Sequence, residues 1–488
     1  MTINILFLAA EAEPFIKIGG LGDVAGALPR AIQKASQDPT LPDVDIRVVL
    51  PYHYAIKQKH FEPAYLGDFK VKKAKGAETC KVYRSDQGPM PVYLLDGDPI
   101  DAKSPVYSPD PVRDGYKFVF FSVAALGLAD FLNWRVDILH CNDWHTAIAI
   151  YALKKLKPPS QYLRHTKTLH TLHNLPYMGF GVQDALTAYA LPPSQDSRLP
   201  EWARHASLPL GLLSADQIVP VSPHYAKEVL TPEFGCGLEN FLATRQDALT
   251  GILNGLDTAT WNPENDPAVA APFSTQTLGA RSQNKASLIK QLNLNPDESV
   301  PLLTLVSRMD PQKGIDIALK GLRQCVDQPW QAILLGTGIP GVEAMAKQLE
   351  ADFPERVRVI LAFDSRLAHQ LYAGADLFMM PSRYEPCGLS QMIAMHYGCV
   401  PVARATGGLV DTIRHVGRKV NGGTGFLFEK PYPSSFARIL KRAFRFYQQP
   451  ASWQQIQKNG MQIDFSWDHS ARQYLSIFQE LMANQPSE

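Results

Sequence analysis

The chain has 488 residues, which is too long for one ordinary domain and predicts two or three. Its formal net charge of +1 gives no electrostatic reason to expect a nucleic-acid or acidic-membrane partner. The 45% hydrophobic content supports full cores, but the longest strongly apolar run, from Phe118 to Ala129, is too short to span a bilayer.

The cysteines suit a reducing compartment. They are scattered without a C-x-x-C pair, so neither a zinc ribbon nor a redox dithiol is indicated. The six are Cys80, Cys141, Cys236, Cys325, Cys387 and Cys399. The first residues lack a basic region and run directly into a predicted strand, so we expect no signal or transit peptide and a cytoplasmic protein.

Strand and helix patterns alternate along both halves, which predicts an α/β protein with parallel sheets. In the first half we expect strands at 3–10, 45–50, 137–140, 166–172 and 217–221, and helices at 113–131 and 146–155. The segment from about 60 to 96 consists of short β-rich pieces and predicts an insertion at the edge of the sheet.

A domain boundary is expected at 257–300, where turn residues accumulate, between a first domain of 1–256 and a second of 301–464. The second half predicts strands at 301–307, 331–335, 357–362, 376–380, 400–402 and 426–428. The last stretch, 433–482, is helical with breaks.

The most informative motif is Arg383-Tyr384-Glu385-Pro386-Cys387-Gly388-Leu389-Ser390. It places Glu385 between a strand and a helix, on the carboxyl edge of the sheet, where such sheets bind ligands. The amides of Gly388 and Leu389 would open the helix and offer donors to an anion. An acidic loop residue without function is the alternative interpretation.

A second motif, Lys17-Ile18-Gly19-Gly20-Leu21-Gly22-Asp23, follows the first strand. Its glycines allow a ligand close to the backbone, and Lys17 supplies a positive charge for phosphate. Residues 20–25 also fit the G-x-G-x-x-A dinucleotide fingerprint. An NAD site, however, needs an acid at the end of the second strand, and Pro51-Tyr52-His53 stands there.

Four further strand ends carry candidate site residues, each with a structural alternative. Arg308 and Lys313 follow the first strand of the second half and suit a diphosphate, although they could be a solvated pair. His173 follows the strand 166–172 and could equally satisfy a core carbonyl. Asp143-Trp144-His145 could bind a sugar or could cap and pack a helix, and Phe363 could face a ligand or fill the core.

With these motifs in order, the chain resembles the bacterial glycogen synthases and the plant or cyanobacterial starch synthases. The resemblance covers nearly the whole length. Besides the segments above, it rests on Thr171-Leu172-His173-Asn174, Thr231-Pro232-Glu233-Phe234-Gly235, Gly251-Ile252-Leu253-Asn254-Gly255-Leu256-Asp257, Gln312-Lys313-Gly314 and Thr406-Gly407-Gly408-Leu409. It implies a GT-B architecture, with two Rossmann-like domains facing a deep cleft, and a final helix at 465–488 that crosses back to the first domain.

The resemblance also implies roles for individual residues. Catalytic roles fall to Glu385, His173, Lys17 and, more weakly, Asp23. Nucleotide-sugar binding falls to Lys17, Gly19, Gly20, Asn254, Arg308, Lys313, Phe363, Cys387, Gly388, Leu389 and Ser390, with Phe363 stacking on adenine. Sugar and glucan binding fall to Asp143, Trp144, His145 and Asn174.

The implied activity is transfer of glucose from ADP-glucose to the non-reducing 4-hydroxyl of an α-1,4-glucan, with retention of configuration. Some related enzymes carry a second glutamate eight residues after the first, but Ile393 stands there, so we favour front-face displacement. No constellation demands a metal, and no cofactor is expected. The alternatives are a sucrose-phosphate-synthase-like enzyme using UDP-glucose, a nucleotide-sugar epimerase and an inactive glucan-binding protein.

Overall fold

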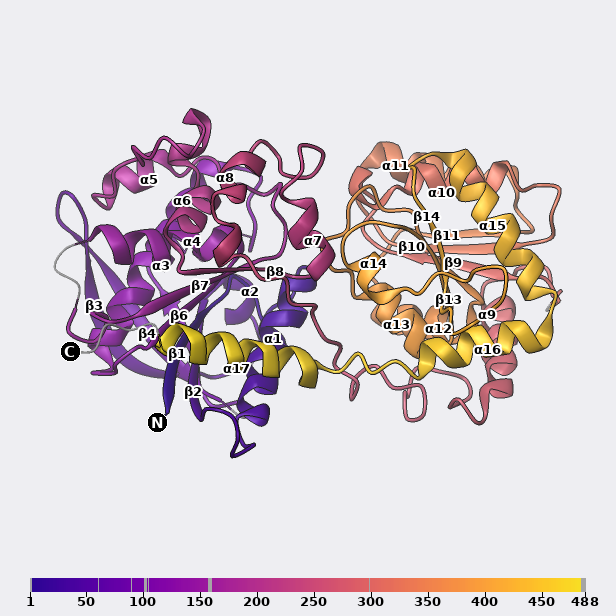
Figure 1. Ribbon diagram of the computed structural model, residues 1–488, viewed down its shortest axis with the longest axis horizontal. Coiled ribbons are helices and arrows are strands. Elements are labelled where there is room, and N and C mark those ends of the chain that lie inside the picture. Colours follow the sequence, from indigo (N-terminus) through magenta and orange to yellow (C-terminus); the bar gives the residue numbers. More distant parts are fainter. Residues whose placement is uncertain are drawn as a thin grey trace. The chain divides into compact units, whose positions relative to one another are not determined.

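The computed structural model describes residues 2–483 apart from residues 60, 89, 101, 102, 104, 157–159 and 298. The chain forms two compact units (Figure 1). Unit 1 comprises Met1–Gly255 and Trp467–Glu488, and unit 2 comprises Leu256–Ser466.

Unit 1 is built on an eight-stranded sheet in the order β3-β4-β5-β2-β1-β6-β7-β8. The strands are β1 (Ile3–Leu8), β2 (Val44–Pro51), β3 (Ala64–Lys72), β4 (Ala77–Ser85), β5 (Val92–Asp96), β6 (Ile138–Asn142), β7 (Lys167–Leu172) and β8 (Gln217–Pro220). All neighbours from β5 to β8 pair in parallel, whereas β4 pairs antiparallel with both β3 and β5. The β-rich segment therefore extends one edge of the sheet, as the sequence predicted.

The α-helices of unit 1 pack around this sheet. They are α1 (Gly20–Ala35), α2 (Tyr54–Lys57), α3 (Pro111–Phe131), α4 (Asp143–Lys155), α5 (Gln183–Ala188), α6 (Ser207–Ser214), α7 (Pro223–Glu228), α8 (Glu239–Ala243) and α17 (Trp467–Ala483), with short 3-10 turns at η1 (Glu201–His205) and η2 (Gln246–Ala248). Helix α3 begins two residues before the predicted start because the Asp110 carboxylate caps it, accepting from the amide of Val112 at 2.9 Å.

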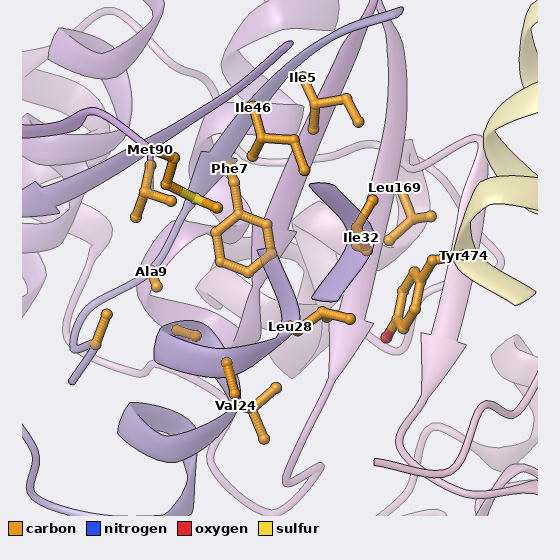
Figure 2. Packing of buried hydrophobic residues seen from close by; sticks show 14 of the residues in the cluster. Ile5, Phe7, Ala9, Val24, Leu28, Ile32, Ile46, Met90, Leu169 and Tyr474 are labelled. Carbon is orange, nitrogen blue, oxygen red and sulfur yellow. The ribbon is translucent and has the colours of Figure 1, made fainter. Parts of the chain in front are cut away.

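The core of unit 1 joins the first and last parts of the chain. Helix α1 buries Val24, Leu28 and Ile32, spaced four residues apart on one face, against Phe7 of β1 (Figure 2). Helix α17 lies alongside α1 and adds Tyr474 to the same cluster (Figure 1). Burying each large apolar side chain contributes about 1.5–3 kcal/mol, so this cluster fixes α17 within unit 1.

Unit 2 is built on a six-stranded, fully parallel sheet in the order β11-β10-β9-β12-β13-β14. Its strands are β9 (Leu302–Val306), β10 (Gln331–Leu335), β11 (Val357–Ile360), β12 (Leu377–Met380), β13 (Val400–Arg404) and β14 (Phe426–Phe428). Its helices are α9 (Arg281–Gln291), α10 (Ile315–Arg323), α11 (Pro340–Asp352), α12 (Ser365–Gly374), α13 (Ser390–His396), α14 (Gly408–Thr412), α15 (Pro433–Tyr447) and α16 (Pro450–Met461), with 3-10 turns at η3 (Leu278–Ala280) and η4 (Pro311–Lys313).

The segment 257–300, expected to be a linker, is an integral part of unit 2. It contains α9, whose buried Lys285 ammonium contacts the Asp376 carboxylate at 2.8 Å and the Val300 carbonyl at 2.6 Å. The turn-rich stretch before α9 suggested a boundary, but these buried polar contacts attach the helix to the second sheet. The unit boundary lies at Gly255 and Leu256 instead, and the C-terminal one at Ser466 and Trp467 rather than before 465.

Candidate functional site

In unit 1, the glycine motif forms the turn between β1 and α1. The Lys17 ammonium lies 2.6 Å from an Asp23 carboxylate oxygen and 3.1 Å from one of Glu13. Despite partial burial, these two carboxylates raise the pKa of Lys17, so the side chain carries its positive charge. Space at Gly26 is tight, because an added Cβ would lie 2.7 Å from the Glu13 carbonyl oxygen. Helix α1 therefore packs closely against the segment that precedes the motif, and Lys17 is held between two carboxylates.

Glu11 holds this turn in place and was not singled out from the sequence. Its buried carboxylate accepts hydrogen bonds from the amide of Ile18, from the amide of Gly19 at 3.1 Å and from the Tyr107 hydroxyl at 2.8 Å. Burial raises the pKa of Glu11 although these donors oppose the shift. The only sequence signal was an acid directly after an apolar strand, at the carboxyl edge of the sheet.

Asp143 and His173 lie at the ends of the neighbouring strands β6 and β7. Asp143 is the first residue of α4, with a left-handed φ of +55°, so the helix begins three residues before the predicted start. Its buried carboxylate accepts from the amides of His173 at 2.8 Å and Asn174 at 3.1 Å. The acid thus fixes the turn that presents His173. Burial raises the pKa of Asp143 from 3.8 to about 7.

His173 is a neutral imidazole whose tautomer follows from its neighbour. The Asn142 amide nitrogen donates to the Leu8 carbonyl, which turns its oxygen toward His173 Nε2 at 2.9 Å. Nε2 therefore carries the proton and Nδ1 is the acceptor. Burial lowers the pKa of His173 to about 3, so the ring stays neutral near pH 7.

Trp144 and His145 occupy different environments. The Trp144 ring is half-buried, whereas His145 is buried with its ring centroid 4.9 Å from that of Tyr107 and 4.8 Å from that of Phe118. Burial holds the pKa of His145 well below its ordinary value. His145 thus packs among these rings, while its Nδ1 has no hydrogen-bond partner among the described residues, and its role at a sugar stays a prediction. Trp144 alone of the two offers part of a ring face.

Asn254 lies in the turn at the end of unit 1 and is buried. Among the residues that the structure describes, its side-chain oxygen has no hydrogen-bond partner. A buried amide oxygen without a partner is costly and therefore available to a ligand.

In unit 2, Glu385 and Lys313 form an ion pair that the sequence did not predict. The Lys313 ammonium lies 2.8 Å and 2.7 Å from the two Glu385 carboxylate oxygens, and the Ser382 hydroxyl donates to one of them at 2.9 Å. Glu385 is only 5% exposed. Lys313 and Ser382 therefore hold the buried Glu385 carboxylate in one orientation.

Two loops press against the backbone around Glu385. At Gly314, with φ of +63°, an added Cβ would lie 2.0 Å from the Pro381 carbonyl oxygen. At Gly407, with φ of +47°, it would lie 1.9 Å from the Glu385 carbonyl oxygen. Both positions need glycine for space and for conformation. The close packing leaves a small pocket, whose polar lining comes from Ser307, Lys313, Ser382 and Ser390.

Arg308 lies on the loop after β9 and is half exposed. Its guanidinium contacts the Asp310 carboxylate at 3.1 Å, while Asp310 also caps η4 by accepting from the Lys313 amide at 3.2 Å. Arg308 and Lys313 therefore belong to one loop but have different acidic partners.

Cys387 to Ser390 form the turn into α13. Cys387 is buried, Gly388 has a φ of +74°, and the helix begins at Ser390 rather than at Leu389.

Phe363 follows β11 and is 87% exposed. That exposure excludes the alternative in which Phe363 fills the core.

Within 2–483 and outside its gaps, no group of three His, Cys, Asp or Glu side chains is arranged to hold a metal ion. None of the helices in the same part of the chain is long and apolar enough to cross a membrane.

Known proteins resemble the chain over its whole length. Residues 4–244 match the starch synthase catalytic domain, and residues 287–460 match the glycosyl transferases group 1. The glycogen synthase of Syntrophotalea carbinolica is 36% identical over 98% of this chain and 99% of its own. The chain belongs to the glycogen and starch synthase family.

Further similar proteins support this family assignment. The glycogen synthase of Anoxybacillus flavithermus is 35% identical over 99% of this chain and 98% of its own. Among solved structures, the catalytic domain of starch synthase IV from Arabidopsis thaliana, bound to ADP and acarbose, has a TM-score of 0.89 and 30% identity over 99% of this chain and all of that one. Sucrose-phosphate synthase from Thermosynechococcus elongatus, at 18% identity and a TM-score of 0.64 over 99% of both chains, shares the GT-B fold.

Proposed function

We propose that this member of the glycogen and starch synthase family transfers glucose from ADP-glucose to the non-reducing 4-hydroxyl of an α-1,4-glucan, with retention of configuration. The single observation that supports this chemistry best is the buried Glu385 carboxylate, held by Lys313 and Ser382. The starch synthase IV relative was solved with ADP and acarbose, which fits an adenine nucleotide and a sugar chain as ligands.

In the proposed reaction, the bond from the anomeric carbon to the phosphate oxygen breaks on one face of the glucose. The acceptor 4-hydroxyl forms its bond to that carbon on the same face, and its proton passes to the departing phosphate. Glu385 stabilises the positive charge that develops at the anomeric carbon. Because this charge is present only in the transition state, stabilising it lowers the barrier of the glucosyl transfer.

The diphosphate is assigned to Lys17, Arg308 and Lys313, without a metal ion. Lysine has three N–H donors, and Lys313 uses contacts to two oxygens of Glu385. A third donor can therefore stabilise phosphate while the first two orient the carboxylate. Exposed Phe363 is assigned to stacking on adenine, which explains a large apolar ring left in water.

The acceptor is assigned to the strand ends of unit 1. The His173 ring and carbonyl are assigned to the transferred glucose, Trp144 to a sugar face and Asn174 to sugar hydroxyls. Asp143 positions His173 and Asn174 through their amides. Asp23, which bonds Lys17, is assigned to orienting the acceptor hydroxyl.

The cysteines, none of them in a disulfide, suit a cytoplasmic reaction.

The test is to incubate the purified protein with labelled ADP-glucose or UDP-glucose and glycogen, with and without EDTA. We expect label from ADP-glucose in the polymer, released by an enzyme specific for α-1,4 bonds, and no loss with EDTA. Preference for UDP-glucose would favour the sucrose-phosphate-synthase-like alternative. Binding of glycogen without incorporation from either donor would overturn the proposed activity.

A further inference from the structure

Unit 1 carries a pair of aromatic rings that the proposed reaction does not use. Phe180, in the loop after β7, is 51% exposed, and Trp202 of η1 is 37% exposed. Their ring centroids lie 5.9 Å apart with an angle of 52° between the planes. Two large rings in contact, both open to solvent, form a small apolar surface, which we name the aromatic pair.

The aromatic pair is continuous with the residues assigned to the sugar. Gly179, next to Phe180, lies so close to Trp144 that an added Cβ would be 2.6 Å from the indole ring. Ser207 joins the two segments, because its amide donates to the Gly179 carbonyl at 3.1 Å and its hydroxyl donates to the Trp144 carbonyl at 2.5 Å. The backbone that carries Phe180 is therefore held in place next to Trp144.

Trp202 is fixed from its other side. A Cβ at Gly237, whose φ is +80°, would lie 3.3 Å from the indole atom Cζ2, so the ring rests against the backbone there. The ring is thus ordered by contacts within unit 1 while part of its surface stays exposed. An ordered ring binds a ligand at lower entropic cost than a mobile one.

We propose that the aromatic pair binds an α-1,4-glucan chain at sugar units farther from the reacting end than Trp144. This inference rests on the proposed function. A polymeric acceptor extends beyond the reaction centre, and the remaining sugars must lie on some surface. Sugar rings present flat C–H faces, which pack on aromatic rings, while their hydroxyls remain in water.

A second copy of this chain is the competing occupant. Stable protein interfaces bury about 800 Å² on each partner, which is far more than two half-exposed rings offer. Glu201, the exposed charged residue preceding Trp202, also disfavours a dry contact. A hydrated sugar polymer fits the aromatic pair better.

The experiment compares full-length Phe180→Ala, Trp202→Ala and the double variant with Tyr65→Ala. Tyr65 is 55% exposed on β3, the edge strand at the far end of the same sheet, and serves as the matched control. Binding is measured as retardation in gels containing glycogen, and transfer is measured with glycogen and with maltotriose as acceptors. Trp202→Phe tests whether another ring restores binding.

We expect the double variant to bind glycogen about five- to fiftyfold more weakly, with a much smaller change in KM for maltotriose, and Tyr65→Ala to behave as wild type. Unchanged retardation of the double variant would overturn the inference, as would equal losses with both acceptors. If Trp202→Ala does not fold, Phe180→Ala carries the test, because its exposed ring contributes little to stability.

The outcomes also separate this inference from the proposed function. If the wild type incorporates no glucose but the double variant is retarded less by glycogen than the wild type, the aromatic pair still binds glucan. The proposed activity alone would then be wrong. A wild type that dimerises in light scattering, with a double variant that is monomeric, would assign the aromatic pair to self-association instead.

Discussion

Glu385 combines burial with two donors, and its charge is the property on which the proposed chemistry depends. Replacing it with Gln keeps the shape and removes the charge. We expect kcat to fall about tenfold to a hundredfold, since a hydrogen bond to a charged group is worth roughly 1.5–3 kcal/mol. The affinity for ADP should stay the same or increase, because Lys313 is no longer paired with a carboxylate at position 385 and can contact the phosphate.

Steady-state kinetics and calorimetry with ADP check this prediction. The matched control is Asp316→Asn, which removes another carboxylate of unit 2 that is paired with a cation, Arg383, at 2.8 Å. It should leave kcat nearly unchanged. Near-normal turnover of Glu385→Gln would remove Glu385 from the mechanism.

Phe363 offers a prediction in which stability and binding separate. Because the side chain is 87% exposed, Phe363→Ala should leave the melting temperature unchanged. Lost stacking on adenine, worth about 1–3 kcal/mol, should raise KM for ADP-glucose about fivefold to a hundredfold. Tyr432→Ala, an aromatic residue of unit 2 that is 57% exposed, is the control. An unchanged KM in Phe363→Ala would end the stacking assignment.

Asp143 gives a pH dependence whose sign follows from burial. Its pKa rises from 3.8 to about 7 on folding, so the folded state binds the proton more tightly than the unfolded state. Its contribution to stability is complete below pH 3.8 and is lost as the pH rises through about 7. Asp143→Asn retains an oxygen acceptor for the two amides but does not titrate.

The measurement is the free energy of unfolding of wild type and Asp143→Asn across this pH range. We expect the wild type to lose stability relative to the variant as the pH rises from about 4 to about 7. Parallel curves for the two proteins would show that Asp143 is not buried as an acid.

At the scale of elements, the loop from β13 to α14 must fit against the loop that carries Glu385. Gly407→Ala should strongly destabilise unit 2, because the new Cβ would lie 1.9 Å from the Glu385 carbonyl oxygen. Gly422→Ala is the matched control, since Gly422 also has a positive φ, +76°, but has no atom within 4 Å of an added Cβ.

Gly422→Ala measures the cost of a positive φ without a clash, about 1 kcal/mol, whereas Gly407→Ala adds the clash and a ψ of −137° that further disfavours a Cβ. Thermal unfolding should therefore show a much larger loss for Gly407→Ala than for Gly422→Ala, together with loss of activity. Equal, small losses would mean that the loop can move away from Glu385 without consequence.

The elements themselves were largely predictable, because apolar runs of strand length alternate with helical periodicity in both halves. Strands β10 and β14 have the predicted bounds, and β1 ends two residues early. Strand ends also gave the general positions of Glu385, His173 and Lys313, since parallel strands end on one edge.

Side-chain contacts were beyond what the sequence could predict. The pair between Lys313 and Glu385 joins residues 72 positions apart, and nothing local specifies it. The sequence likewise could not show that the first turn of α4 packs His145 beside Tyr107. Glu11 was missed because its role depends on the amides of a turn seven residues away. Turn-rich sequence around 257–300 also concealed α9, which is anchored through Lys285.

At the scale of the whole molecule, the proposed roles are distributed over both units. Unit 1 holds Lys17, Trp144 and His173, whereas unit 2 holds Arg308, Lys313, Phe363 and Glu385. Neither unit contains the complete set. The family relationship likewise spans both units, with 36% identity over 98% of the chain. The proposed activity therefore needs residues of both units.

The most direct test of the central claim follows glucosyl transfer by proton NMR, with full-length protein, ADP-glucose and a maltooligosaccharide. We predict that the anomeric signal of ADP-glucose is replaced by that of a new α-1,4 linkage, with ADP released in equal amount. A β-linked product, release of free glucose only, or transfer from UDP-glucose but not ADP-glucose would contradict the account.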